Sequence, residues 1–480
     1  MSSSFSHHSE GAAAAHVVVA GGGLAGLASA VWLAERGHRV TLVEKAGRLG
    51  GRTFSFEVPG VEGLVDNGQH LFAGCYDALL SYVRTIGSAE GLRWDAPPLA
   101  IRTGPGELRT GSGPAWLPSW ARRVVGPAWL AWPPIPLRDR PATLRTWARL
   151  ALAVARQDER LDELTVDRWF RTIGVPASLR ALTLDQFVIG LLNEQPDRVS
   201  AFTFVQALRF ISGRALAGNP RAGDAIWPRV SLHELFVAPA ERYLRARGGE
   251  IHTGAKLADV VLRDGRVHGV ELAGGRVIDC DAAVLALTPW ALATVLDRGG
   301  LGAHDFFTPV RKIEAAPISS VYLWLDRPLR MRRLAENLRG TTIEWVFDTG
   351  GMHGAADAAE HCYSLAVSAS WNVVHQRNAE FIDAAIESLH RHYPESRSAR
   401  VVRSKVIHQP AATFSAQPGF ESLRLPHVTP IPGLFLAGDW TRTGLPSTME
   451  SAADSARRAT GAVADYLAAP AAPAAPAGSR

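Results

Sequence analysis

The 480-residue sequence has few cysteines and lysines, and it contains no long apolar run. Cys75, Cys280 and Cys362 are far apart and odd in number, so we expect neither a disulfide framework nor a metal site. We also expect a reducing, cytoplasmic location. Only four lysines occur, and the net charge of +5 comes from scattered arginines rather than from a basic block. Nucleic-acid binding is therefore not expected.

No stretch of about 18 uncharged apolar residues occurs, so we expect no membrane-spanning helix. Residues 1–15 lack the basic start and apolar core of a signal peptide, and we predict a disordered leader there. Residues 468–480 form an Ala/Pro tail that we also predict to be disordered. The intervening chain, in a sequence with 47% hydrophobic and 20% charged residues, is typical of a globular protein with more than one domain.

The strongest motif is a glycine-rich loop near the N-terminus, between a β-branched run and a helical pattern. Residues 17–19 predict a buried parallel strand, and residues 39–44 predict a second strand that ends at an acid. Such a unit binds a dinucleotide, because glycines permit a tight turn and let the pyrophosphate approach the helix start. An acid at this place accepts from a ribose hydroxyl and disfavours NADP. The predicted contact residues are Gly21, Gly23, Leu24, Ala25, Gly26, Glu44 and Lys45.

A second glycine pair follows this unit, with Gly50 and Gly51 between Arg48 and Arg52. Two guanidiniums beside an open backbone suit a diphosphate. The stretch resembles the fingerprint of FAD-dependent amine oxidases and phytoene-desaturase-like enzymes. The resemblance implies an α/β fold, in which a Rossmann-like GR2-type FAD-binding domain carries a second, α+β substrate domain. It also places these four residues near the phosphates and ribityl chain of FAD.

Residues 431–467 resemble the segment with which the same family returns to the flavin. A buried strand is followed by Gly438 and Asp439, and the resemblance implies that the acid lies beside the ribityl and phosphate groups. We predict that Ser447 caps the next helix, with Glu450 as its capping-box partner. The dipole of this helix would then favour negative charge on reduced flavin. Ser447, Thr448 and Met449 are the predicted contact residues there.

The resemblance also locates an adenine contact and implies a discontinuous cofactor domain. In the strand "AKLADVV" one backbone contacts the adenine, and Val260 is our choice for it. In monoamine oxidases, a cysteine of this C-terminal segment bonds the flavin covalently. Residues 431–467 contain no cysteine, so the resemblance implies noncovalent FAD. The predicted FAD domain combines residues 15–72, 228–288 and 408–467. Residues 73–227 and 289–407 would form the substrate domain.

The stretch "DNGQHLFAGCY" that begins at Asp66 resembles the squalene-associated branch of this superfamily, the hydroxysqualene dehydroxylases of the hopanoid pathway. "WPRVSLHELF" and "GDWTRTGLPSTMESA" resemble the same branch. The resemblance implies reductive removal of the hydroxyl of hydroxysqualene to give squalene. A carotenoid or phytoene-type desaturase, an amine oxidase and a non-catalytic FAD-folded lipid-binding protein remain alternatives. An apolar isoprenoid is the expected partner, and no motif indicates the electron donor.

Three side chains of this stretch are candidate proton donors for the leaving hydroxyl. His70 is the first, because imidazole can be protonated near neutral pH. Asp66 could orient it or donate a proton itself if burial raises its pKa, and Tyr76 is the third. The alternative is that the polar groups hold the backbone and the flavin without touching substrate. Asn67, Gly68 and Gln69 are accordingly predicted cofactor contacts.

Residues 116–157 combine tryptophans, prolines and an arginine-rich helical pattern. Apolar positions recur at helical spacing from Leu144 to Ala155, with arginines on another face. One interpretation is a helix packed on the core. The other is a surface that lies on the inner face of the membrane and admits a lipid.

Overall fold

The structure is a computed structural model that describes residues 14–95, 100–104, 107–110, 135–219, 221–354 and 359–469. One half of the molecule, to which distant parts of the sequence contribute, is built on a five-stranded parallel sheet. The strands, in spatial order, are β10 (Glu250–His252), β2 (Arg39–Val43), β1 (His16–Ala20), β14 (Ala282–Leu285) and β20 (Leu434–Leu436). A parallel sheet buried on both faces requires continuous apolar strands, and the Val17–Val19 run supplies one of them. The predicted α/β fold with a parallel sheet is confirmed.

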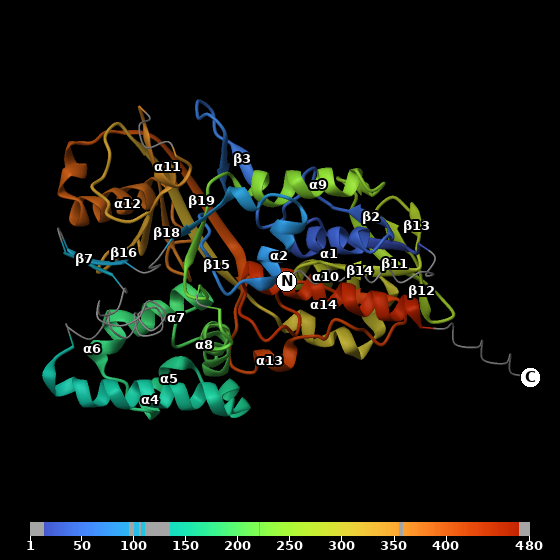
Figure 1. Ribbon diagram of the computed structural model, residues 1–480, viewed down its shortest axis with the longest axis horizontal. Coiled ribbons are helices and arrows are strands. Elements are labelled where there is room, and N and C mark those ends of the chain that lie inside the picture. The colour runs from blue at the N-terminus through green and yellow to red at the C-terminus, as the bar shows by residue number, and fades with distance from the viewer. Residues whose placement is uncertain are drawn as a thin grey trace, which may run out of the picture.

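Helices cover this sheet and bring distant segments together. α1 (Leu24–Glu35) packs against α14 (Met449–Ala468), and α14 contacts α2 (Asp77–Thr85). α9 (Ala238–Arg245) packs beside α1 (Figure 1). An antiparallel sheet of β11 (Leu257–Arg263), β12 (Arg266–Leu272) and β13 (Val277–Asp279) adjoins them.

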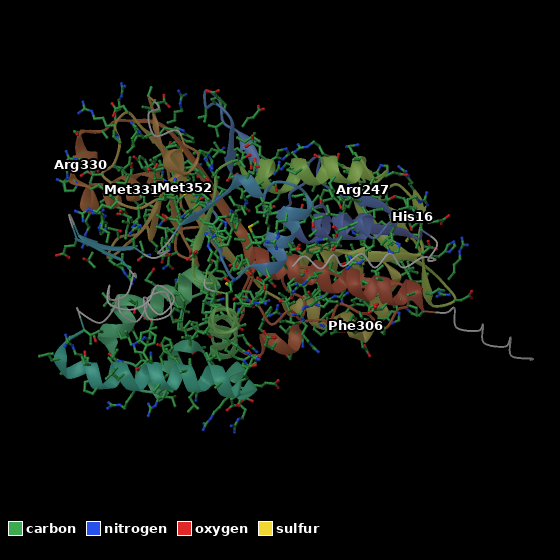
Figure 2. The ribbon with its side chains drawn as sticks, viewed as in Figure 1. His16, Arg247, Phe306, Arg330, Met331 and Met352 are labelled. Carbon is green, nitrogen blue, oxygen red and sulfur yellow. The ribbon has the colours of Figure 1, made fainter. Side chains whose placement is uncertain are left out.

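The second half is a seven-stranded sheet with helices on both sides. Its strands, in spatial order, are β19 (Val401–Phe414), β15 (Ala315–Leu325), β18 (His361–Val367), β17 (Trp345–Asp348), β16 (Ala335–Leu338), β7 (Ala100–Gly104) and β8 (Glu107–Thr110). α12 (Asn378–His392) packs on this sheet, and four helices lie on its other side (Figure 1). They are α4 (Arg140–Arg156), α5 (Val166–Thr172), α7 (Asp185–Leu192) and α8 (Ala201–Leu216). Met331 and Met352 lie in this half, whereas His16 and Arg247 lie at the opposite end (Figure 2).

Shorter elements connect the two halves. β3 (Ser55–Glu57) pairs with β4 (Leu64–Asp66), and β9 (Ala225–Pro228) pairs with β5 (Phe72–Ala73) and β6 (Leu92–Asp95). α10 (Pro289–Leu296) follows β14, and the short helices are α6 (Ala177–Leu179), α11 (Thr349–Met352) and α13 (Phe420–Leu423).

The predicted domain boundaries can be compared with these strands. All five parallel strands come from the three segments assigned to the cofactor domain. The boundary at residue 408 falls inside β19, which continues to Phe414 because it pairs with β15 along most of its length. Residues 1–13, 470–480 and 111–134 lie outside the described residues, and with them lie most of the predicted leader and tail and part of the predicted membrane segment. No helix in the described ranges is long and apolar enough to cross a bilayer.

Candidate active site

A cavity of about 1980 Å³ extends from the glycine-rich loop to the seven-stranded sheet. At one end it is lined by glycines and polar residues, among them Gly21, Asn67 and Asp439. At the other end apolar and aromatic side chains predominate. The cavity therefore joins a predicted cofactor site to a predicted substrate site.

Backbone atoms pack so closely against Gly21, Gly26 and Gly51 that a side chain at any of these positions would force the backbone to move. A Cβ on Gly26 would lie 1.7 Å from the Gly21 carbonyl oxygen. Gly21 has a φ of +110° and faces the backbone of Ala286, which brings β14 against the loop. A Cβ on Gly51 would lie 2.9 Å from the Gly23 Cα, so the second glycine pair packs on the first.

Glu44 closes this loop through both carboxylate oxygens. Oε2 accepts from the Gly22 N–H at 2.7 Å, and Oε1 accepts from the Ala46 N–H at 2.8 Å. Helix α1 has no side-chain cap at its N-terminus, where Gly23 is the N-cap residue. Its first N–H groups are thus available to a pyrophosphate in the cavity.

Two amide side chains next to this loop have polar atoms without a protein partner. Both Oε1 and Nε2 of Gln69 are buried and unbonded, and so is Oδ1 of Asn67. Both side chains line the cavity, and Asn67 Nδ2 donates to the Arg52 carbonyl at 2.7 Å. Buried polar groups are normally hydrogen-bonded, so these atoms indicate a polar molecule bound here.

Asp439 also lines the cavity and is held by two donors. Arg52 Nη2 donates to its Oδ1 at 2.5 Å, and the Ser447 hydroxyl donates to its Oδ2. Burial alone would raise the pKa of Asp439, but the Arg52 charge and the hydrogen bonds from Arg52 and Ser447 lower it below its usual value. The carboxylate is therefore ionised and fixed at the cavity wall.

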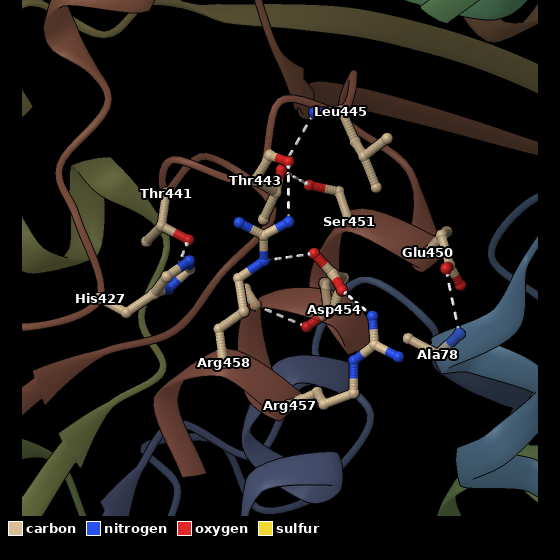
Figure 3. Close-up of polar contacts among 12 residues, drawn as sticks. Ala78, His427, Thr441, Thr443, Leu445, Glu450, Ser451, Asp454, Arg457 and Arg458 are labelled. Carbon is tan, nitrogen blue, oxygen red and sulfur yellow. Dashed lines mark hydrogen bonds and ion pairs between the residues drawn. The ribbon is translucent and has the colours of Figure 1, made fainter. Parts of the chain in front are cut away.

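The start of α14 differs from the predicted capping box. Thr448, not Ser447, is the N-cap, and its hydroxyl accepts from the Ser451 N–H at 3.1 Å. Glu450 instead accepts from the N–H groups of Ala78 at 3.0 Å and Leu79 at 2.9 Å, at the start of α2 (Figure 3). Glu450 thus caps a neighbouring helix rather than its own. This fastens the segment after Tyr76 to α14.

Sequence reasoning missed Arg424, which is fully buried behind this segment. Its guanidinium donates to the carbonyls of Asp439, Thr441 and Leu445 at 2.9 to 3.1 Å. It also donates to the Thr443 hydroxyl at 2.7 Å and to Glu421 at 3.2 Å. A lone arginine without helical or strand periodicity gives no sequence signal for such a role. The structure makes it the residue that holds the Gly438–Leu445 loop.

Several predicted contact residues do not line the cavity. Val260 of β11 pairs with Val270 of β12, and the residues of this segment that line the cavity are Ala255 to Ala258 instead. Arg48 is exposed, and its guanidinium carbon lies 4.0 Å from the centre of the Phe54 ring. Gly26 and Gly50 shape the loop from behind rather than line it. The other predicted contact residues all line the cavity.

Asp66 does not line the cavity and is corrected as a proton-donor candidate. Its Oδ1 accepts from the Ser55 hydroxyl at 2.6 Å and from the Leu232 N–H at 2.9 Å. Burial raises the pKa of this carboxyl to about 6. Through its two hydrogen bonds, Asp66 joins the β3–β4 hairpin to the turn before α9.

His70 and Tyr76 line the cavity, but neither is a strong acid there. His70 Nδ1 lies 2.8 Å from the Gly68 carbonyl oxygen, which can only accept, so Nδ1 carries the proton. Burial lowers the pKa of His70, which favours the neutral ring with Nε2 as an acceptor. Burial also raises the pKa of Tyr76 well above its usual range, so its phenol stays protonated.

The substrate end lies under the seven-stranded sheet. Paired residues on adjacent strands line it in a row, from Ser320 through Ala366 and Trp345 to Asn337. Gln409 extends this wall to β19, so five strands at about 4.8 Å spacing make it roughly 19 Å wide. Helices α4, α7 and α8 supply the facing wall, which includes Trp147, Phe187, Phe204 and Leu208. The helical wall suits a long apolar molecule, whereas Ser320, Asn337 and Gln409 add polar groups to the sheet wall.

The match of the sequence to a family model shows which kind of cofactor this site binds. A family model for flavin-containing amine oxidoreductases matches residues 24–464. The chain belongs to this family. FAD is therefore its cofactor, and the unpartnered amides, the free start of α1 and the fixed carboxylate at Asp439 fit it. Cys75 is buried and does not line the cavity, so noncovalent binding stays our prediction.

The curated relatives include a hydroxysqualene dehydroxylase and 15-cis-phytoene desaturases. The chain is 26% identical over 458 residues to hydroxysqualene dehydroxylase of Zymomonas mobilis, covering 92% of this chain and 97% of that protein. It is 25% identical over 493 residues to a 15-cis-phytoene desaturase of Capsicum annuum, covering 97% of this chain and 81% of that protein. A desaturase of Synechococcus elongatus is 24% identical, with 91% and 93% covered.

Solved structures share the fold at lower identity. Cyclohexylamine oxidase from Brevibacterium oxydans aligns with a TM-score of 0.70 at 16% identity, covering 95% of this chain and 100% of that chain. A triple mutant of putrescine oxidase aligns with a TM-score of 0.71 at 14% identity, covering 94% of this chain and 99% of that chain. At these identities the likeness concerns the fold alone.

Proposed function

We propose that this flavoprotein removes the hydroxyl of hydroxysqualene reductively to give squalene. The observation that supports it is the continuous cavity, whose polar end fits FAD and whose apolar end lies under five strands. An apolar cavity with few polar groups suits a long isoprenoid. The likeness to the Zymomonas enzyme over nearly the full length of both chains supports the same reaction.

The protein's own residues would bind the lipid, orient its hydroxyl and exclude water. Bound reduced FAD supplies a hydride in this chemistry. Loss of the hydroxyl as water would consume one proton, which fully reduced FAD can release together with the hydride, and would leave an allylic cation that aromatic side chains such as Trp345 and Phe347 can stabilise. His70 Nε2, as an acceptor, would hold the substrate hydroxyl.

A phytoene-type desaturase is the second candidate. The observation that favours it is the neutral state of His70, because an unprotonated Nε2 can take up the proton that desaturation releases. The desaturase relatives support it as well.

The residues around the cavity support an amine oxidase less than either of these two functions. An amine oxidase would require a lysine near the flavin ring. Neither Lys312 nor Lys405 lines the cavity, and in the described part of the wall the lysines are Lys45 and Lys256 at the dinucleotide end. A non-catalytic protein would need neither the unpartnered amides nor the Arg52–Asp439 pair.

An anaerobic experiment separates these functions. The flavoprotein is reduced with dithionite, the excess reductant is removed, and hydroxysqualene is added. We expect the oxidised flavin spectrum to return as squalene appears in the lipid extract. Bleaching of the oxidised protein by phytoene, with no response to hydroxysqualene, would instead establish the desaturase. No response to either lipid would exclude both.

The role of His70 is tested by substitution and pH. His70→Leu should lower kcat/KM for hydroxysqualene about tenfold through loss of one hydrogen bond, and His70→Gln should lower it less. Because burial lowers the pKa of His70, kcat/KM should be constant above pH 6.5 and fall only under more acidic conditions. A rate that rises as the pH falls through 6.5 would show that protonated His70 acts as an acid.

A further inference from the structure

Three of the exposed large apolar side chains lie on helix α4 or just before it. Leu137, just before α4, is 76% exposed, and Leu144 and Leu152 on α4 are 58% and 46% exposed. Leu71, which lines the cavity, is 40% exposed. Elsewhere in the described residues the exposed large apolar side chains are three separate valines, Val277, Val402 and Val428. Scattered single residues are ordinary, whereas a cluster indicates a binding surface.

Helix α4 orders these residues into a stripe. At 100° per residue, exposed Pro141, Leu144, Ala148, Ala151, Leu152 and Ala155 occupy one continuous sector of the helix. The next sector holds three exposed arginines, Arg145, Arg149 and Arg156. α4 contains no acidic residue. In Figure 1 this helix forms the outer edge of the molecule, beyond α5 and α8.

The same helix also forms part of the cavity. Trp147, Leu150 and Val154 line it from the buried side of α4. Ala151 and Ala155 both line the cavity and are solvent-exposed, so the cavity opens at the edge of the exposed stripe. Ile211 and Ala215 of α8 line the same region. A lipid that leaves this opening meets apolar surface before water.

We propose that the exposed face of α4 rests on a bilayer with anionic headgroups and that the cavity receives its lipid directly from that bilayer. The inference rests on the proposed function, because an isoprenoid substrate resides in the membrane. A leucine and alanine stripe can sink into the acyl boundary while the arginines reach the headgroups beside it. The charged residues of α4 are all arginines, which favours an anionic membrane over a protein partner, because the rim of a protein interface carries charges of both signs.

Flotation with vesicles tests this surface. The FAD-loaded protein is mixed with vesicles that contain either phosphatidylcholine alone or phosphatidylcholine with about 30% phosphatidylglycerol. The second composition supplies the anionic lipid that electrostatic binding requires. We expect the wild type to float with the anionic vesicles. Leu144→Gln/Leu152→Gln should weaken binding by about a hundredfold or more, since two apolar side chains no longer enter the bilayer. Arg145→Gln/Arg156→Gln should remove the preference for phosphatidylglycerol.

Matched controls use equally exposed residues elsewhere. Val277→Gln/Val428→Gln and Arg263→Gln/Arg276→Gln should float like the wild type. All variants should turn over detergent-dispersed hydroxysqualene at the wild-type rate, because the changed side chains lie outside the cavity. Failure of the wild type to float, with turnover intact, would refute the membrane surface. Flotation without turnover of any lipid in detergent would refute the proposed function instead.

Discussion

Replacing Gly26 with alanine is expected to yield a protein without bound flavin. The new Cβ would lie 1.7 Å from the Gly21 carbonyl oxygen and 3.3 Å from the Ala286 Cβ. The first of these neighbours is backbone, so the loop between β1 and α1 must move before the side chain fits. That movement displaces the N–H groups at the start of α1, which are the predicted pyrophosphate contacts. Absorbance at 450 nm per mole of purified protein measures the loss directly.

Gly461→Ala is the control, because it also replaces a helical glycine with alanine. Gly461 lies within α14, and a Cβ built on it meets no atom within 4 Å. Gly461→Ala should keep full flavin and should stabilise the protein by about 0.5–1 kcal/mol, since alanine has less backbone freedom to lose. A Gly26→Ala protein with wild-type flavin content would contradict the proposed role of the loop.

The cofactor half was predictable because its chemistry is local. The glycine spacing, the strand before it and the acid at Glu44 lie within 30 residues, and each has a steric or electrostatic reason to be there. The structure places Gly21, Gly23 and Glu44 together at the cavity wall. Periodicity and turn chemistry are enough for such a unit, because its parts contact one another along the chain.

The errors lie where contacts join distant segments. Asp66 and Glu450 are both buried acids, yet each accepts from backbone N–H groups of another segment, Asp66 at Leu232 and Glu450 at Ala78 and Leu79. A local rule paired Glu450 with Ser447, and the tertiary structure overrode it. The part of residues 255–261 that reaches the cavity is likewise fixed by tertiary contacts, among them the pairing of β11 with β12. Such choices are not encoded in any single stretch.

The second large effect is expected from Arg424→Met. Methionine fills much of the volume but removes five hydrogen bonds and leaves the carbonyls of Asp439, Thr441 and Leu445 without their donor. The loss of a buried charged partner costs about 3–5 kcal/mol, so the free energy of unfolding should fall by that amount. Urea unfolding followed by tryptophan fluorescence measures it.

Arg457→Met is the matched control for this substitution. Arg457 is half-exposed and pairs with Asp454, which keeps Arg458 as a second partner (Figure 3). Its loss should change the free energy of unfolding by less than about 1 kcal/mol. A urea midpoint for Arg424→Met equal to that of Arg457→Met would contradict the role of Arg424.

The flavin distinguishes a local from a global effect of Arg424. The loop that Arg424 holds carries Asp439, and Asp439 pairs with Arg52 at the cavity wall. If Arg424 positions this loop, FAD should dissociate from Arg424→Met at a urea concentration below the main unfolding transition, whereas flavin release and unfolding should coincide in the control. Coincident transitions in both variants would mean that Arg424 stabilises the whole fold without positioning the cofactor segment. The order of the two transitions, rather than their size, therefore decides whether this buried arginine belongs to the site.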